Sequence, residues 1–228
     1  MVVGKWGRGN GSQDRRRAGL GVTAKNPHRP DRPLTLEAAD IHQHAGPLWR
    51  IHRSAGTHKM TWNGLRDFGP LPRFRWEPHP LPVQNHPGVG VSYTAAGVVT
   101  AFAEVFQERR AITLTGQQLL TAWMPSRTLE LLDLSRNHWA LHHGASASLP
   151  AAPKSTCRNW AASIYAELGT QIDGLYVPST VTGDPVAVLF SRAATAFPMA
   201  PDFSRPLTHV SVEKLALQAA DTLRWPIH

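Results

Sequence analysis

The sequence contains a single cysteine, Cys157, in 228 residues. One thiol excludes an internal disulfide and any zinc site built from several cysteines. Its neighbours Thr156, Arg158 and Trp160 supply no base that would activate the sulfur, so we interpret Cys157 as structural. This cysteine usage is typical of a reducing, cytoplasmic compartment.

Long apolar runs are also missing. No segment approaches the roughly 20 apolar residues that a membrane-spanning helix needs, so we expect no membrane protein. The basic, glycine-rich N-terminus is not followed by the apolar stretch of a secretory signal. Charged residues make up only 18% of the chain, but the 42% that are hydrophobic suffice for the core of one domain.

The net charge of +8 is unevenly distributed. Residues 1–33 hold eight of the 24 Lys and Arg side chains against two Asp, whereas residues 34–228 are nearly balanced. The first segment lacks any apolar period, so we predict a disordered basic extension over 1–33 and one domain over 34–228. A nucleic-acid-binding protein acting through this tail remains an alternative, although the near-neutral domain argues against it.

Helical and strand-like patterns alternate irregularly along the domain, with hairpin-like spacing near its end. This favours an α+β fold with a mixed, mainly antiparallel sheet and flanking helices. The long Gly/Pro-rich segment 54–88 is predicted to be a functional loop. Strands are expected at 48–52, 111–115, 128–134, 172–177, 186–190 and 207–210, and helices at 35–42, 116–123, 155–168 and 213–223.

Familiar catalytic motifs are absent. The sequence has no phosphate-binding loop, no dinucleotide-binding glycine motif, no HExxH and no Gly-x-Ser-x-Gly. His138 and His142 are four residues apart, but no third ligand stands at a suitable spacing, so no metal is expected.

Val91–Glu108 is the most informative stretch. It begins as a short strand and is predicted to become a helix at Tyr93, with Val98, Phe102 and similar residues on the buried face. Glu104, the first charge after 26 uncharged residues, then falls on the opposite face among small side chains. This predicts a ligand-facing wall. The alternative is an ordinary exposed helix glutamate.

Other isolated polar residues stand inside apolar elements. Arg50 lies in a predicted strand, and Ser179 directly follows the strand-like sequence IDGLYVP. A fixed guanidinium recognises diphosphates, and a carboxylate beside a sugar stabilises an oxocarbenium-like transition state. These residue types suit a nucleotide diphosphate with a cleavable glycosidic bond. Ser179 as a simple turn cap and Tyr93 as a core residue remain alternatives.

Four motifs in order resemble the RES domain, a family named after an arginine, a glutamate and a serine. They are LWRIHR (48–53), RWEPH (75–79), YTA…AEV (93–105) and DGLYVPS (173–179), and the resemblance covers about 46–195. By position, the three residues look like Arg50, Glu104 and Ser179. The resemblance implies an ADP-ribosyltransferase-like fold and the toxin of a RES–Xre toxin–antitoxin pair.

The resemblance also implies NAD⁺ as the substrate. Arg50 and Arg75 would hold its diphosphate, Tyr93 would cover the nicotinamide or its ribose, and Glu104 would stabilise the cation formed on the ribose. Ser179 would hydrogen-bond ribose or phosphate. The nicotinamide–ribose bond would be cleaved by phosphorolysis, with inorganic phosphate, or by hydrolysis.

Two alternatives stay open. The chain could transfer ADP-ribose to a protein, or it could be a non-catalytic family member that only binds the antitoxin. The implied partner is an Xre-type helix-turn-helix antitoxin, with nucleic acid contacted only through it and a homodimer allowed within the complex. The chain departs from the family pattern at Glu77, where a neutral residue is common, and at Pro178, where an arginine is common. Arg53 also competes with Arg50 for the first role.

Overall fold

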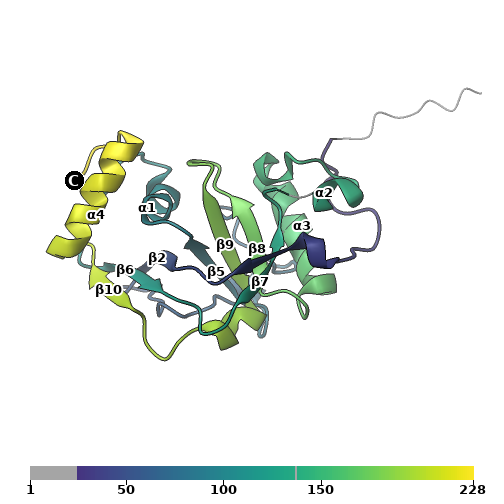
Figure 1. The fold of residues 1–228 in the computed structure, drawn as a ribbon, viewed down its shortest axis with the longest axis horizontal. Helices are drawn as coiled ribbons and strands as arrows, with labels where there is room; N and C mark the ends of the chain where they lie inside the picture. The colour runs from purple at the N-terminus through teal and green to yellow at the C-terminus, as the bar shows by residue number, and fades with distance from the viewer. Residues whose placement is uncertain (1–24, 137) are drawn as a thin grey trace, which may run out of the picture.

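The computed structural model describes residues 25–136 and 138–228, which form a sheet of eight strands flanked by helices (Figure 1). The strand order is β1-β7-β8-β9-β5-β2-β6-β10, and β3 and β4 form a separate small ribbon. The strands are β1 (Ile41–His44), β2 (Leu48–Arg53), β3 (Phe68–Gly69), β4 (Gln84–Asn85), β5 (Val91–Ala95), β6 (Gln118–Trp123), β7 (Leu129–Asp133), β8 (Gly174–Pro178), β9 (Pro185–Phe190) and β10 (Phe203–Pro206). The α-helices are α1 (Val98–Phe106), α2 (Trp139–His142), α3 (Lys154–Leu168) and α4 (Val210–Leu223), with 3₁₀ turns at Ala38–Asp40, Leu149–Ala151 and Ser191–Ala196.

Antiparallel pairing dominates the main sheet. Among its described strands only β7 and β8 run parallel, and every other neighbouring pair is antiparallel. The mixed, mainly antiparallel α+β fold expected from the sequence is therefore confirmed.

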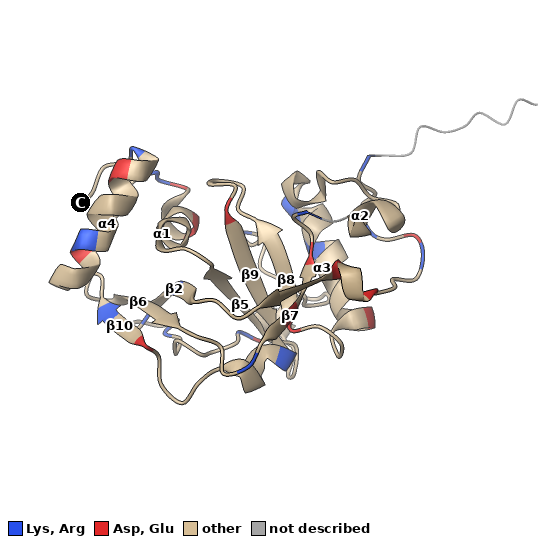
Figure 2. Cartoon of the chain, viewed as in Figure 1, with Lys and Arg blue, Asp and Glu red and all other residues tan. Residues whose placement is uncertain are grey.

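The helices stand in two groups at opposite ends of the sheet (Figure 1). At one end, α1 and α4 pack around the fully buried Phe102, in a cluster that includes Ile51 of β2 and Leu120 of β6. At the other end, α3 buries Trp160 and Ile164 against β7, β8 and β9. Charged side chains are sparse on the central strands between these groups (Figure 2).

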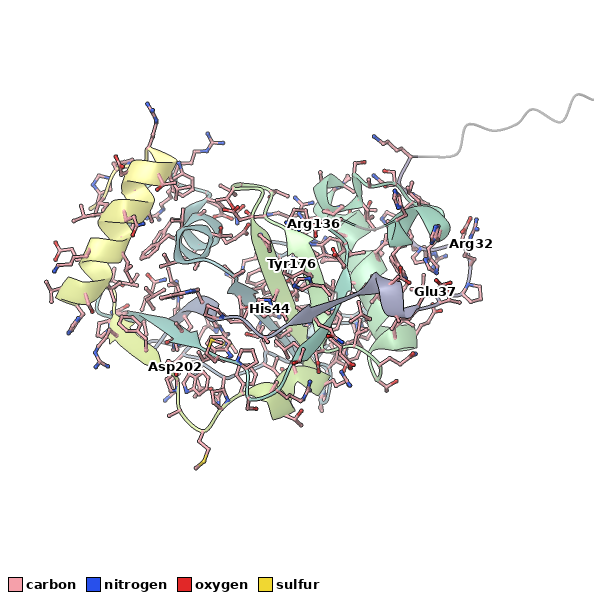
Figure 3. The ribbon with its side chains drawn as sticks, in the orientation of Figure 1. Arg32, Glu37, His44, Arg136, Tyr176 and Asp202 are labelled. Carbon is pink, nitrogen blue, oxygen red and sulfur yellow. The ribbon has the colours of Figure 1, made fainter. Side chains whose placement is uncertain are left out.

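The opposite face of the sheet carries a third core and a small aromatic cluster. His42 stacks on Tyr176 with ring centroids 3.7 Å apart. The buried His44 lies beside Tyr176 (Figure 3). Burial lowers the pKa of His44, and the nearby His42 lowers it further. These side chains therefore remain neutral at physiological pH and serve as packing.

Several expected elements are confirmed. The strands at 48–52, 128–134 and 186–190 correspond to β2, β7 and β9, and the C-terminal part of 172–177 corresponds to β8. The helices at 155–168 and 213–223 correspond to α3 and α4. The segment 54–88 is largely loop, as expected, with only the ribbon of β3 and β4 inside it.

Other expectations were wrong. The helix expected at 116–123 is strand β6, because this segment pairs with β2 on one side and β10 on the other. The helix expected at 35–42 is a short 3₁₀ turn leading into β1, and the strand expected at 111–115 is a single bridge from Ile112 to Ile227. The last strand lies at β10, just before the expected range 207–210.

The expected N-terminal extension over 1–33 divides at residue 25. Residues 1–24 lie outside the described residues. Within 25–33, Asn26 hydrogen-bonds Ser146 and Ser148, and the carbonyl of Pro27 accepts the indole N–H of Trp160 at 2.9 Å. This part of the segment is therefore packed against the domain.

Candidate functional site

Helix α1 meets the turn between β8 and β9 through two polar side chains. Gly97 caps the helix in an extended conformation, and Thr100 and Glu104 follow one turn apart on the same side of α1. The Ser179 hydroxyl donates to Glu104 Oε1 at 2.6 Å, and Thr100 Oγ1 lies 3.0 Å from Thr182 Oγ1. The structure thus brings two of the sequence-predicted site residues into direct contact.

Ser179 is 5% exposed, and its hydroxyl is fully engaged. Besides donating to Glu104, the oxygen accepts the backbone N–H groups of Val181 and Thr182, each at 3.1 Å. Ser179 therefore caps its turn and holds Glu104 at the same time. With both lone pairs occupied, this hydroxyl is arranged to position a neighbour and not to attack a substrate.

Glu104 carries a charge that its surroundings leave uncompensated. Its second carboxylate oxygen accepts from the side-chain amide of Gln107 at 3.1 Å. Among the described residues no Lys or Arg forms an ion pair with it, although Glu104 is only partly exposed. A carboxylate whose hydrogen-bond donors are all neutral is suited to stabilise a positive charge that develops beside it.

Tyr93 lies in strand β5, so the helix expected from Tyr93 to Glu104 begins only at Val98. The Tyr93 ring stacks on Phe74 with centroids 5.1 Å apart, and its hydroxyl donates to Glu77 Oε1 at 3.2 Å. Burial raises the pKa of Tyr93 well above its ordinary value, and the negative charge of Glu77 raises it further. The phenol therefore stays protonated and acts as a hydrogen-bond donor.

Arg50 is buried without a carboxylate partner among the described residues. Its guanidinium donates to the carbonyls of Trp62 and Gly64, both at 2.9 Å. Burial lowers its pKa to about 10, with the nearby Arg66 contributing, so the side chain is still charged at neutral pH. Its second terminal nitrogen lies 3.9 Å from the sulfur of Met60. A buried cation that is bound only by neutral groups is an unusual feature of a protein core.

Arg50 does not reach the Glu104–Ser179 pair. Trp49 pairs with Ala95 and packs on the α1 side, and successive residues of a strand alternate between faces. Arg50 therefore leaves the sheet on the face opposite to α1, where the segment 60–64 receives it. Among the described contacts, Arg50 touches neither Glu104 nor Ser179, so a substrate site shared by these residues stays a prediction.

Arg75 also makes its contacts away from Glu104 and Ser179. Its guanidinium contacts the carbonyl of Ala152 and the sulfur of Cys157, next to α3. Cys157 itself is fully buried, and burial raises the pKa of its thiol, as suits the structural role expected for it. The competing Arg53 is exposed and lines a depression of about 310 Å³ beside the end of α1, away from Ser179.

A model of the RES domain matches residues 47–209 of this chain. The chain belongs to the RES domain family. In this RES domain the match includes Arg50, Tyr93, Glu104 and Ser179, and it extends beyond the range of about 46–195 that the motifs alone suggested.

A solved structure also resembles the RES domain described here. It is a chain in the crystal structure of the M.tuberculosis MbcT-MbcA toxin-antitoxin complex, with a TM-score of 0.51 and 17% sequence identity. The similarity covers 78% of the present chain and 92% of that chain, and at this identity it establishes the fold alone. No curated protein matches the sequence.

The two departures of this RES domain have different surroundings. Pro178 ends β8 opposite Pro185, so the position before Ser179 carries no guanidinium. Glu77 is completely buried and binds Arg66, the hydroxyl of Tyr93 and the backbone N–H of Leu71. In the sequence, Glu77 stands out only as a departure from the family pattern, and nothing in the spacing of the loop indicates Arg66 as its partner.

Over 25–136 and 138–228, no group of three or more His, Cys, Asp or Glu side chains is arranged to hold a metal ion. No helix in that part of the chain has the length and apolar character needed to cross a membrane.

Proposed function

We propose that this RES domain protein cleaves the nicotinamide–ribose bond of NAD⁺ as the toxin of a toxin–antitoxin pair. The observation that carries the proposal is the Glu104 carboxylate, held by Ser179 at 2.6 Å and left without a described cationic partner. A fixed, uncompensated negative charge stabilises a positive charge that develops beside it, provided the site excludes water. Bond cleavage in NAD⁺ generates such a charge on the ribose.

The chemistry follows from where the electrons go. The electron pair that forms the bond from C1″ of the nicotinamide ribose to the ring nitrogen leaves with nicotinamide and neutralises its positive ring. The ribose is left with oxocarbenium character, which Glu104 stabilises at short range. Tyr93, whose ring is held by Phe74, presents a flat surface suited to the nicotinamide or its ribose.

The acceptor is inorganic phosphate or water. Phosphate attack gives a 1″-phosphorylated ADP-ribose, and water attack gives ADP-ribose and a proton. Ser179 is an unsuitable acceptor because both lone pairs of its oxygen already receive backbone N–H groups. Transfer of ADP-ribose to a protein stays the alternative within the same chemistry.

Arg50 is the guanidinium that best suits the diphosphate in this proposal. It is buried, charged and free of any described carboxylate, whereas Arg66 is bound to Glu77 and Arg75 to the α3 side. Strands β2 and β5 pair only at Trp49 and Ala95, so the sheet opens next to Arg50. Diphosphate binding there requires the segment 60–64 to exchange its carbonyl contacts with Arg50 for the ligand.

The proposed partner is an Xre-type antitoxin that covers the Glu104 site in the cytoplasm. The fold similarity to a chain in a toxin–antitoxin complex supports a protein antitoxin as the partner. Such a partner is needed because an uninhibited enzyme would deplete the NAD⁺ of its host. Expression should arrest growth and lower cellular NAD⁺ when the chain is alone, and both effects should disappear when the antitoxin is co-expressed. Growth arrest with steady NAD⁺ would indicate a different target.

The experiment that tests the activity is incubation of the purified chain with NAD⁺, with and without phosphate, followed by separation of the products. Release of nicotinamide is the expected result, and a phosphate requirement distinguishes phosphorolysis from hydrolysis. Absence of nicotinamide under both conditions, from a folded chain, would leave only the non-catalytic, antitoxin-binding alternative.

A further inference from the structure

Glu77 is the point at which the long loop is tied to the central sheet. It is 0% exposed, and donors approach both of its carboxylate oxygens. Oε1 receives Arg66 and the hydroxyl of Tyr93, while Oε2 receives the N–H of Leu71 at 3.1 Å and lies 3.3 Å from Nδ1 of His79. Tyr93 belongs to β5, and the other partners belong to the loop.

The loop backbone is shaped so that the Glu77 carboxylate can lie close to it. A methyl group on Gly69 would lie 2.4 Å from the His79 ring nitrogen and 2.8 Å from Glu77 Oε2, so the backbone passes where no side chain fits. Arg66 also lies over the ring of Phe74, 5.0 Å from its centroid, and Phe74 stacks in turn on Tyr93. The ring of Tyr93 is thus held by stacking and its hydroxyl by Glu77.

Glu77 remains ionised in this setting. Burial alone would raise its pKa, but the close approach of the His79 ring and the hydrogen bond from Arg66 outweigh burial and lower it. An ionised carboxylate is needed here because several hydrogen-bond donors converge on the two oxygens of Glu77. An amide in the same place would offer one oxygen and would turn an N–H₂ group towards donors.

We propose that Glu77 is a positioning residue of the NAD⁺ site, which fixes Tyr93 through its hydroxyl and commits Arg66 to the loop. This inference rests on the proposed function, because it takes Tyr93 as the surface that receives the nicotinamide or its ribose. Glu77 touches no substrate itself. It sets the orientation of a ring that does, and it leaves Arg50 as the buried guanidinium available to the diphosphate.

The test separates binding from turnover. NAD⁺ affinity is measured by calorimetry on the full chain carrying Glu104→Gln, in which bond cleavage is expected to be blocked. Glu77→Gln and Tyr93→Phe are added singly and together. Each single change should weaken NAD⁺ binding about tenfold, the usual effect of losing one hydrogen bond to a charged group. The pair together should weaken it little further, because both changes remove the same contact.

Asp173→Asn is the matched control. Asp173 is also a fully buried carboxylate, paired with Arg127 at 2.7 Å and Arg192 at 3.1 Å, but it lies at the opposite end of β8 from Ser179. This variant should lower the melting temperature and leave NAD⁺ affinity unchanged. If it weakens NAD⁺ binding as much as Glu77→Gln does, the effect of Glu77 is general destabilisation and the inference is overturned.

The remaining outcomes are equally distinct. Additive losses in the double variant would overturn the inference. Unchanged affinity in Tyr93→Phe would also overturn it, and that result can be obtained even if Glu77→Gln fails to fold. Failure of the Glu104→Gln chain to bind NAD⁺ would overturn it as well. Turnover by the wild type is a separate measurement: coupled binding losses without turnover would support the role of Glu77 and refute the proposed cleavage.

Discussion

The hydroxyl of Ser179 donates to the carboxylate of Glu104 at 2.6 Å across 75 residues of sequence. This contact joins helix α1 to the end of strand β8 and leaves Glu104 without a described counter-cation. The sequence allowed two interpretations of Ser179, as a site residue and as a turn cap, and the side chain has the contacts of both. It also defines the first variant to make.

Ser179→Ala should reduce nicotinamide release by about tenfold, because Glu104 loses its strongest fixed donor. The free energy of unfolding should fall by about 1 kcal/mol, because the N–H groups of Val181 and Thr182 lose their acceptor. Thr180→Ala, an exposed neighbour, is the control and should behave as the wild type. Wild-type turnover in Ser179→Ala would show that Glu104 needs no such support.

Arg50 and Arg75 should respond differently to truncation. Arg50→Ala should raise KM for NAD⁺ by about tenfold or more, which is the effect of losing one charged hydrogen bond. The reason is that the Arg50 guanidinium has no described carboxylate partner and is available to the diphosphate. Arg75→Ala should instead lower the melting temperature with KM nearly unchanged, because Arg75 holds Ala152 and Cys157 beside α3. Steady-state kinetics on both variants decide the matter, and the reverse pattern would contradict the assignment of the diphosphate to Arg50.

The stability of the fold should fall as the pH drops below neutral. Burial lowers the pKa of His42, His44 and His52 from the ordinary value of 6.5, so the unfolded chain binds their protons at higher pH than the folded chain does. The stability linked to them is complete above about pH 6.5 and is lost as the pH falls through the lowered pKa values. The melting temperature should therefore be lower at about pH 5.5 than at about pH 7.5.

His52→Gln provides the check on this pH dependence. His52 bonds the carbonyl of Met60 and the hydroxyl of Thr121 inside the fold, and a glutamine cannot titrate there. The variant should show a smaller drop in melting temperature between the two pH values. An equal drop in variant and wild type would assign the acid sensitivity to other groups.

N-terminal truncation should have a threshold near residue 25. Removing residues 1–24 should leave the melting temperature and NAD⁺ turnover close to those of the full chain. Removing residues 1–33 should cost about 1–3 kcal/mol of stability, because the fully buried Trp160 loses the acceptor of its indole N–H and Ser146 loses Asn26. Equal stability of both truncations would show that the contacts of Asn26 and Pro27 contribute nothing.

Local pattern was sufficient for the elements whose period is unambiguous. Helix α3 buries Trp160, Ile164 and Leu168 on the stripe that their spacing indicates, and β9 buries the apolar run that ends at Phe190. Segment 118–123 was misassigned because a short apolar run fits a helix or a strand equally well. Its pairing with β2 and β10 decides for a strand, and those partners lie far away in sequence.

The candidate site shows the same division. The sequence predicted that Glu104 lies off the packed face of its helix, and Ser179 is indeed its neighbour. Arg50 and His52 share one face of β2, as the alternation of side chains along a strand requires, but nothing in the sequence indicated that this face is the one opposite to α1. The direction of Arg75 depends on how the long loop folds back on α3, and no local period records that.

The most direct test of the account is NAD⁺ consumption by Glu104→Gln beside the wild type, with and without phosphate. Gln keeps the length of the side chain and its hydrogen bond from Ser179 but removes the charge that stabilises the ribose cation. Turnover should fall by about a hundredfold or more, mainly in kcat, with the melting temperature close to the wild-type value. Wild-type turnover in this variant would remove Glu104 from the chemistry and contradict the account.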